Sequence, residues 1–241
     1  MRGPYFSFSS RCYLECEGCH TFFVYFPGRS FYYVQLNFSN KALDRKNDSI
    51  GKLIAHFKTY FPLNSMERSE VVQHFTERRI KRRELILQPG DVCRHFTFVI
   101  SGCFKLYAVD QAGKEHNIQF AAENDWTADL TSFYNEKPSL LYIEAIEPSV
   151  ILQIKHADLL QFYIDYHKFD RNFRIIIERK YIALQSRVLQ HISQSAEERY
   201  QSFLADYPQL ALRLPNTEIA SYLGITPEFL SKIRKDLSAR S

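Results

Sequence analysis

NTEIASYLGITPEFLSKIRKDL, the stretch from Asn216 to Leu237, decides how the carboxyl-terminal part of this chain folds. Its apolar residues recur at the three- and four-residue spacings of an amphipathic helix, on both sides of a central Leu-Gly-Ile. Gly224 provides the positive φ that a tight corner between two helices needs. Thr226 is then a good N-cap residue, and Pro227 suits the first helical position. The stretch predicts a helix-turn-helix, a pattern of DNA-binding proteins, and the alternative is an ordinary corner in a helical domain.

Upstream of this motif, a long apolar stripe predicts one continuous helix. Its members follow one another at steps of three or four residues: Phe169, Phe173, Ile177, Tyr181, Leu184, Val188 and Ile192. We expect the members from Phe173 to Val188 to form a dimer seam between two copies of the chain. The alternative is a core helix that packs against its own subunit. Ser195 and Glu198 then have the spacing of a capping box, which places a hinge near residues 193–195.

Before the stripe, the pattern changes to short apolar runs separated by Gly-containing turns. An apolar helical face from Ile50 to Phe61 ends at Pro62, and Asn64 with Glu67 predicts the capping box of a second short helix. The strand predictions that follow are 85–87, 96–100, 104–108, 118–120, 142–146 and 150–154. Because these runs are short and nearly evenly spaced, they are typical of an antiparallel barrel or jelly roll.

A basic run stands at the entrance to this region. It consists of Arg78, Arg79, Lys81, Arg82 and Arg83. Lys and Arg at an exposed strand edge protect a sheet from pairing with other sheets. The same charges would attract DNA or phosphate groups. We expect the strand-edge role, with the phosphate patch as the alternative.

Residues 1–48 differ in composition from the rest of the chain. Two aromatic clusters, at 22–26 and 31–38, flank Pro27-Gly28 and indicate a β-hairpin. Three cysteines and a histidine in the order C-x3-C-x2-C-H are candidate ligands for a metal ion or an iron–sulfur cluster. These residues are Cys12, Cys16, Cys19 and His20. We favour the alternative, which is an extension of uncertain structure, or a mis-assigned start, without a metal site.

Bulk properties narrow the function classes. A chain of 241 residues suits two modest domains, and no apolar run is long enough to span a bilayer. The first residues lack the apolar core and cleavage site of a signal peptide, so we expect a cytoplasmic protein. Its five cysteines are then not expected to form a disulfide framework. The net charge of +4 permits nucleic-acid binding without requiring it.

The order of these features resembles the Crp/Fnr superfamily of transcription regulators. The resemblance covers about residues 49–237 and rests on PGDVCRHFTFVISGCFKLY at 89–107, DQAGKEHNIQF at 110–120 and ITPEFLSKIRKDL at 225–237. It implies an α+β fold with an antiparallel β-roll (jelly-roll-like) sensor domain, a long dimerisation helix and a carboxyl-terminal helix-turn-helix domain. The implied boundaries are 1–48 for the extension, 49–165 for the cyclic-nucleotide-binding-like effector domain, 166–194 for the dimerisation helix and 195–241 for the DNA-binding domain.

The resemblance also locates an effector pocket. In cyclic-nucleotide binders of this fold, a Gly-Glu-Leu segment binds the ribose, and an arginine about ten residues later binds the phosphate. Here the first segment reads Ala128-Asp129-Leu130, and the later region, which includes Ser139, has no arginine. A buried phosphate without a guanidinium would lose a charge-assisted ion pair, so we do not expect a cyclic nucleotide. The implied pocket residues are Asp129, Leu130 and Ser139, and for Asp129 the alternative is a carboxylate that caps a short turn.

The second helix of the helix-turn-helix is the one that reads DNA in this family. The matching candidates are Glu228, Ser231, Lys232, Arg234 and Lys235. Glu228 can accept from a cytosine amine and Lys232 can donate to a guanine, whereas for Phe229 we favour internal packing over contact with a thymine methyl. The expected partners are double-stranded DNA with an inverted repeat, a second copy of the chain, an unknown small-molecule effector and, by resemblance, RNA polymerase, but no membrane.

Two rival functions stay open. A redox-sensing or iron–sulfur regulator of the same family would combine Cys12, Cys16 and Cys19 with Cys93 or Cys103. A cupin-like metal enzyme would share the jelly-roll pattern but would not explain the helix-turn-helix. The histidines are scattered, and the sequence has no Gly-rich phosphate loop and no HExxH motif, so we expect no enzymatic activity, no metal and no cofactor.

Overall fold

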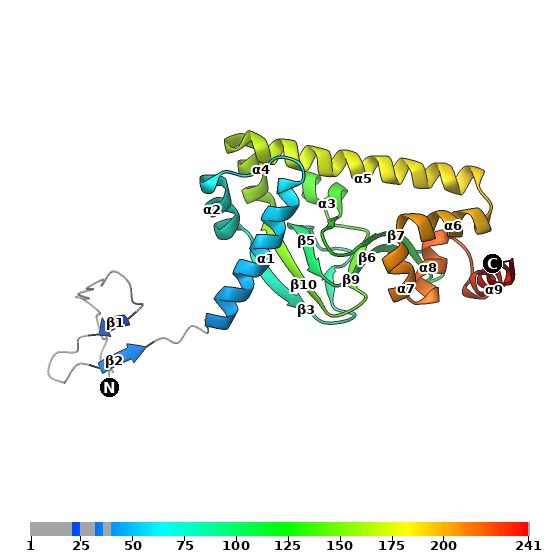
Figure 1. Cartoon of the computed structure of the whole chain (residues 1–241), viewed down its shortest axis with the longest axis horizontal. Coiled ribbons are helices and arrows are strands. Elements are labelled where there is room, and N and C mark those ends of the chain that lie inside the picture. The colour runs from blue at the N-terminus through cyan, green and yellow to red at the C-terminus, as the bar shows by residue number, and fades with distance from the viewer. Residues whose placement is uncertain (1–20, 25–31, 36–39, 241) are drawn as a thin grey trace, which may run out of the picture. The chain divides into compact units, whose positions relative to one another are not determined.

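The structure is a computed structural model that describes residues 21–24, 32–35 and 40–240, with side chains from Arg45 to Arg240 (Figure 1). The chain divides into two compact units, residues 1–45 and 46–241. In the first unit, strands β1 (Thr21–Val24) and β2 (Tyr32–Gln35) pair antiparallel, as the two aromatic clusters predict. The four candidate metal ligands in 12–20 lie outside the described residues.

A β-roll occupies residues 76–155 of the second unit. Its two antiparallel sheets have the strand orders β3-β10-β5-β8 and β4-β9-β6-β7, which confirms the predicted fold class. The strands are β3 (Thr76–Ile80), β4 (Leu85–Leu87), β5 (His95–Ser101), β6 (Phe104–Val109), β7 (Glu115–Ala121), β8 (Trp126–Thr127), β9 (Tyr142–Ala145) and β10 (Ser149–Lys155). The predicted apolar runs coincide with β4, β5, β6, β7, β9 and β10. The basic run occupies β3 and the turn after it, and both β3 and β4 are edge strands.

Helices cover the outer face of the β3-β10-β5-β8 sheet. The helices before α5 are α1 (Asn40–Lys58), α2 (Ser65–His74), α3 (Leu130–Asn135) and α4 (His156–Asp165). Trp126 is the centre of this packing, because its ring lies 4.8 Å from that of Phe98, 6.1 Å from Phe57 of α1 and 5.0 Å from Phe173 of α5. Burying an apolar side chain of this size contributes about 1.5–3 kcal/mol. The aromatic cluster therefore fixes two helices to the roll.

Strand β5 is buried on both faces. Residues 96–100 are all buried, although the alternation of Phe96, Phe98 and Ile100 predicts a single buried face. Phe96 and Phe98 contact rings on the helical side, while Thr97 bonds to Gln153 of β10 within the roll. When both faces of a strand are covered, its outward positions need not be polar. The strand then lacks the apolar–polar alternation by which a sequence reveals it.

The predicted long helix is α5 (His167–Ser193), whose two halves differ in burial. Phe169, Phe173 and Ile176 are buried in the subunit's own core, and Asn172 accepts from and donates to the backbone of Phe61 at 3.1 Å each. The prediction of a dimer seam is therefore wrong for Phe173, which is 1% exposed, and the core-helix alternative describes this half. Ile177 is also partly buried against the core. From Tyr181 onward the apolar members of the stripe are exposed.

Four further helices complete the chain: α6 (Ala196–Asp206), α7 (Pro208–Arg213), α8 (Asn216–Leu223) and α9 (Pro227–Arg240). The predicted capping box precedes α6, where Ser195 N donates to Glu198 at 2.7 Å and Glu198 N donates to Ser195 Oγ at 3.3 Å. The capping box of Asn64 and Glu67 at α2 is likewise confirmed. The carboxyl-terminal helices share a second core with Cys103 and Phe120 of the roll, so they pack directly against it.

Candidate nucleic-acid interface and effector cavity

The corner between α8 and α9 is built as its sequence predicts. Gly224 has a φ of +69°, and the N–H of Ile225 donates to the carbonyl of Ala220 at 3.0 Å, which ends α8. Thr226 Oγ1 accepts from the N–H of Phe229 at 3.2 Å as α9 begins. The buried residues that hold the two helices together are Ile219, Ala220, Leu223, Leu230 and Ile233. The helix-turn-helix is therefore a packed unit with its apolar face inward.

The outward side of α9 carries four of the five predicted DNA-contacting residues. Glu228, Ser231, Lys232 and Lys235 are all exposed, and their spacing of three and four residues places them along one side of the helix. Hydrogen bonds from the backbone N–H of Glu228 itself and then from Thr226 hold the pKa of the Glu228 carboxyl below its ordinary value of 4.5. The face therefore offers two cations and one ionised acceptor, which are groups that read bases and bind phosphates in a major groove.

Two neighbours on α9 differ from their predicted roles. Arg234 is half-buried, donates to Tyr200 Oη at 2.8 Å and Asn216 Oδ1 at 2.5 Å, and stacks over the Tyr200 ring. Its guanidinium thus joins α9 to α6 and α8 instead of pointing toward DNA phosphates. Phe229, for which internal packing was favoured, is 46% exposed beside Glu228. An aromatic ring at the start of the helix is consequently available to a thymine methyl.

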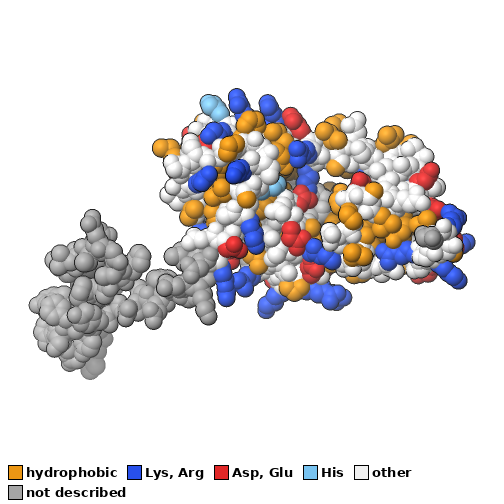
Figure 2. All heavy atoms as spheres, in the orientation of Figure 1, with side chains coloured by type: hydrophobic (Ala, Val, Ile, Leu, Met, Phe, Trp, Pro, Cys, Tyr) orange, Lys and Arg blue, Asp and Glu red, His pale blue; other side chains and the backbone are white. Residues whose placement is uncertain are grey.

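The second half of α5 presents an apolar surface that has no partner within the described residues (Figure 2). Its exposed side chains are Tyr181, Ile182, Leu184, Val188, Leu189 and Ile192. Exposures of 66% for Tyr181 and 79% for Ile192 are high for large apolar residues on one helix. Patches of this kind mark interaction surfaces in soluble proteins.

A cavity of about 350 Å³ lies where the roll, α5 and the carboxyl-terminal helices meet. Its apolar walls come from all three parts: Leu106, Ile118 and Phe120 from the roll, Ile177 and Leu184 from α5, and Tyr207 and Tyr222 from the carboxyl-terminal helices. Of the predicted effector residues, Asp129 and Leu130 line this cavity, whereas Ser139 does not. The volume falls in the range of small-molecule sites.

Asp129 is the N-cap of α3. Its Oδ1 accepts from the N–H groups of Thr131 and Ser132 at 3.0 and 3.3 Å, and its Oδ2 accepts from the Ser139 hydroxyl at 2.7 Å. Both oxygens of this buried carboxylate are therefore engaged inside the protein. The capping alternative describes Asp129, and Ser139 acts as its fixed partner.

Two cations of α5 that were not predicted also line the cavity, and each already has partners. Lys180 pairs with Asp125 at 2.5 Å. Arg187 donates to the backbone carbonyls of Asn117, Ile118 and Tyr222, and lies 3.9 Å from the centre of the Tyr222 ring. No sequence pattern distinguishes these residues from solvated cations, because their partners are distant in the chain. Because both cations are already paired, the free surface of the cavity is largely apolar.

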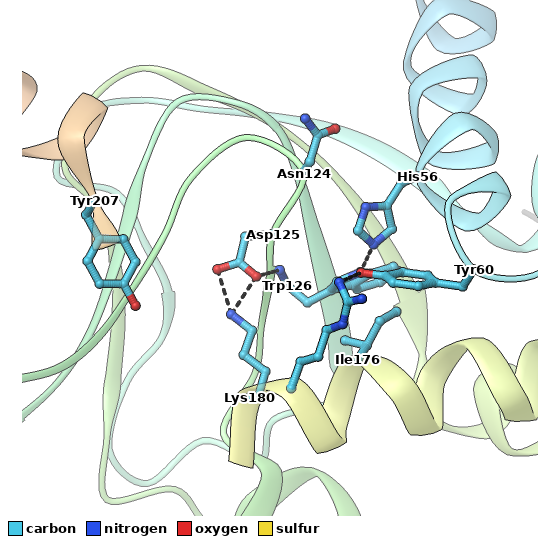
Figure 3. A pocket seen from close by; sticks show the side chains of 9 residues that line it. His56, Tyr60, Asn124, Asp125, Trp126, Ile176, Lys180 and Tyr207 are labelled. Atoms are coloured by element: carbon cyan, nitrogen blue, oxygen red, sulfur yellow. Dashed lines mark hydrogen bonds and ion pairs between the residues drawn. The ribbon is translucent and has the colours of Figure 1, made fainter. Parts of the chain in front are cut away.

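A second cavity of about 230 Å³ lies between α1, the turn before β8 and α5 (Figure 3). His56 accepts from the indole N–H of Trp126 at 3.2 Å, and Asp125 and Lys180 face each other in the same view. Burial, together with the charge of Arg179, holds the pKa of His56 below 6.5, although Asp125 acts in the opposite sense. Because Asp125, Lys180 and Tyr207 line both cavities, the Lys180–Asp125 pair stands between them.

Metal-ligand clusters, thiols and membrane-spanning helices are the remaining candidate features of the described residues. No group of three or more His, Cys, Asp or Glu in residues 45–240 is placed to hold a metal ion. Cys93 and Cys103 are free and buried, and burial raises the pKa of the Cys103 thiol to about 12. Among the described helices, none combines the length and the apolar character needed to cross a bilayer.

Comparisons with known proteins agree with this architecture. The family model for the cyclic nucleotide-binding domain matches residues 77–166. The probable transcriptional regulator flp of Lacticaseibacillus casei is 23% identical over 182 residues, which are 73% of this chain and 82% of that protein.

Two solved structures show the same fold. FixK2 from Bradyrhizobium japonicum is 19% identical, with a TM-score of 0.62 over 69% of this chain and 85% of that one. A putative Crp/Fnr regulator from Eubacterium rectale is 16% identical, with a TM-score of 0.59 over 76% and 88%. Residues 77–166 thus match the cyclic nucleotide-binding domain, and the chain has the fold of the Crp/Fnr transcription regulators, the family that its sequence resembles.

Proposed function

We propose that this chain is a cytoplasmic, DNA-binding transcription regulator that acts as a dimer under the control of a small, largely uncharged effector. The observation that carries the proposal is the exposed side of α9, where Glu228, Lys232 and Lys235 lie together on a helix whose apolar side is packed inward. A helix with this division of charge and burial, placed second in a helix-turn-helix, fits the major groove of DNA. RNA polymerase is a further partner by family resemblance.

Dimerisation is supported by the apolar surface on α5. Tyr181, Leu184, Val188 and Ile192 recur at steps of three and four residues, which is the spacing of a two-helix seam. A second copy of α5 would bury this surface and bring two α9 helices into one complex. Such a dimer is expected to bind an inverted repeat with half-sites about one helical turn apart.

The choice of effector follows from the 350 Å³ cavity between the roll, α5 and the carboxyl-terminal helices. Asp129 caps α3 and accepts from Ser139, Lys180 is paired with Asp125, and Arg187 is held by three carbonyls. The carboxylate would repel a ligand phosphate, and both cations already have partners, so the phosphate of a cyclic nucleotide would be desolvated without a new ion pair. An aromatic or aliphatic molecule of low charge fits the walls better.

We further propose that the functional boundaries are 49–165 for the effector domain, 166–194 for the dimerisation helix and 195–241 for the DNA-binding domain. The hinge before α6 supports the last boundary, because α5 ends at Ser193 and Ser195 caps the next helix. The amino-terminal segment 1–48 is outside this assignment.

Selection of bound sequences from random duplex DNA tests the proposal. The expected product is an inverted repeat, against which single variants are titrated at two salt concentrations beside a scrambled duplex. Lys235→Ala should weaken binding to both duplexes and reduce the slope of log affinity against log salt by about one unit per subunit. Glu228→Ala should weaken the selected duplex alone, by about 1–3 kcal/mol per half-site.

A matched control comes from helix α1. Lys58→Ala removes an equal charge from the exposed end of that helix, which Figure 1 places away from α9, and should leave both affinities within about twofold. Recovery of no preferred sequence would refute the proposed function. If Glu228→Ala instead lowers both affinities equally, Glu228 acts as the helix-start charge and reads no base.

A further inference from the structure

A third cavity, of about 490 Å³, lies inside the roll at the edge formed by β3 and β4. It is lined by residues of both sheets, with Thr97 and Gln153 on one side and Leu87 and Ile143 on the other. Its lining contains none of the residues that surround the proposed effector cavity. The two cavities are therefore separate places for a ligand.

The interior of this third cavity combines apolar walls with buried hydrogen-bonding groups. Thr97 and Gln153 are 2% and 5% exposed, which is unusual for uncharged polar residues inside a β-roll. Gln153 Nε2 donates to Thr97 Oγ1 at 3.0 Å, and Gln153 Oε1 accepts from Arg78 at 3.1 Å. Among the described residues, Gln153 Nε2 donates to nothing else, so its second N–H is left for a ligand oxygen.

The mouth of the cavity is cationic. Arg78 and Arg94 line it, and Asp91 is the one acidic residue of the lining. Arg78 also forms an ion pair with Glu84 at 3.6 Å. From Glu77 to Arg94 the chain carries six Lys and Arg against three Asp and Glu, and Figure 2 shows Lys and Arg side chains along the rim of the roll below β3. His95 also lines the cavity, and burial, followed by the charges of Arg78, Lys155 and Arg94, lowers the pKa of its imidazole. Such a concentration of positive charge at a concave site attracts anions.

We propose that this cavity binds a small organic anion, with its charged head at Arg78 and Arg94 and its apolar body between Leu87 and Ile143. The guanidinium groups supply charge-assisted hydrogen bonds, and the Gln153 amide supplies one further donor deeper inside. A free inorganic ion would leave the apolar walls uncovered. An uncharged molecule would leave Arg94 without a partner within residues 45–240 and Arg78 with Glu84 and Gln153 alone. The proposal goes beyond transcription regulation through the proposed effector cavity, and it holds or fails independently of DNA binding.

Octanoate is the probe, because it combines a carboxylate with a chain that fits between the two sheets. Methyl spectra of the full protein, labelled at Ile and Leu, are recorded during titration. We expect the methyl signals of Leu87 and Ile143 to shift with a dissociation constant of about 1 mM or tighter, while those of Ile177 and Leu184 in the effector cavity stay in place. Inorganic phosphate has the negative charge without the alkyl chain, and 1-octanol has the chain without the charge. Each should bind about tenfold more weakly than octanoate.

The arginines are tested by neutral replacements. Arg78→Gln and Arg94→Gln should each weaken octanoate about tenfold, whereas Arg79→Gln should change it less than twofold. Arg79 is the matched control, because it neighbours Arg78 on β3, has the same charge and does not line the cavity. The methyl spectrum of each variant reports whether its roll is folded.

Four results would overturn the proposal. They are no shift at Leu87 and Ile143, shifts confined to Ile177 and Leu184, equal affinity for octanoate and 1-octanol, and equal weakening by Arg78→Gln and Arg79→Gln.

Discussion

Replacing Arg187 by methionine should destabilise the whole second unit, because this one side chain joins three parts of it. Arg187 extends from α5 and donates to the carbonyls of Asn117 and Ile118 in β7 and of Tyr222 in α8. It also stacks on the Tyr222 ring. Methionine keeps much of the stem but removes every hydrogen bond and leaves three carbonyl groups without their donor.

The expected loss follows from these contacts. Hydrogen bonds from a charged donor contribute about 1.5–3 kcal/mol each, and the cation–π contact adds about 0.5–2 kcal/mol. Two terms act in the opposite direction, because Arg187 Nε is buried without a partner among the described residues and burial lowers the pKa of the guanidinium. The gross gain from the contacts is about 5–11 kcal/mol, and we expect a net loss of about 3 kcal/mol, roughly half of its lower end. For a chain of this length, that loss lowers the melting temperature by about 6–12 °C.

Scanning calorimetry of the full chain measures this shift, and Arg174→Met is the matched control. Arg174 lies on the same helix, but it is exposed and pairs with Glu178 one turn away at 3.6 Å. Such a pair contributes about 0.3–0.5 kcal/mol, so the control should melt within about 2 °C of the unmodified chain. An Arg187→Met chain that melts as high as the control would refute the idea that Arg187 joins the roll to the helix-turn-helix.

Three other outcomes are expected. Val188→Glu should convert the dimer to monomers in light scattering, because the new carboxylate would be desolvated in the seam, and a persistent dimer would place the seam elsewhere. Calorimetry with cyclic AMP or cyclic GMP should show no dissociation constant in the micromolar range, and a micromolar one would contradict the account of Asp129 and Lys180. Because burial lowers the pKa of His56, the unfolded chain takes up the proton first as pH falls below about 6.5, and stability is lost there. In urea unfolding at pH 7 and 5.5, His56→Gln, which can still accept from Trp126, should lose less stability than the unmodified chain.

Local signals in the sequence were sufficient for most elements of the fold. The capping boxes at Asn64 and Ser195, the turn at Gly224 and the edge-strand charges all act within a few residues, so they can be read without knowing the tertiary structure. Strand β8 is two residues long and had no periodic pattern to show. The alternation expected in β5 failed for the opposite reason, because both of its faces are covered.

The site was harder to predict, since its partners are far apart in sequence. A single apolar stripe along α5 has the same helical period whether it faces the roll or solvent, so Phe173 and Val188 looked equivalent although only Val188 is exposed. The charge of Arg234 suggested DNA, whereas Tyr200 and Asn216 hold its guanidinium inside the domain. Charge and helical periodicity in the sequence identify candidate residues. They do not show which residue, distant in sequence, each candidate contacts in the folded chain.

The position of the proposed effector cavity explains how a ligand bound there would influence α9 without contacting it. Phe120 belongs to the roll, Leu184 to α5 and Tyr222 to α8, and all three line the same cavity. A ligand there contacts both domains, so its binding free energy depends on how α8 sits against β7. A tenfold preference for one placement shifts that equilibrium by about 1.4 kcal/mol, and the same factor must appear in DNA affinity if α9 moves with α8. Because Arg187 holds the carbonyl of Tyr222, its bonds contribute to the energy against which any such ligand must act, together with those of Lys105 and Asn117 to α8.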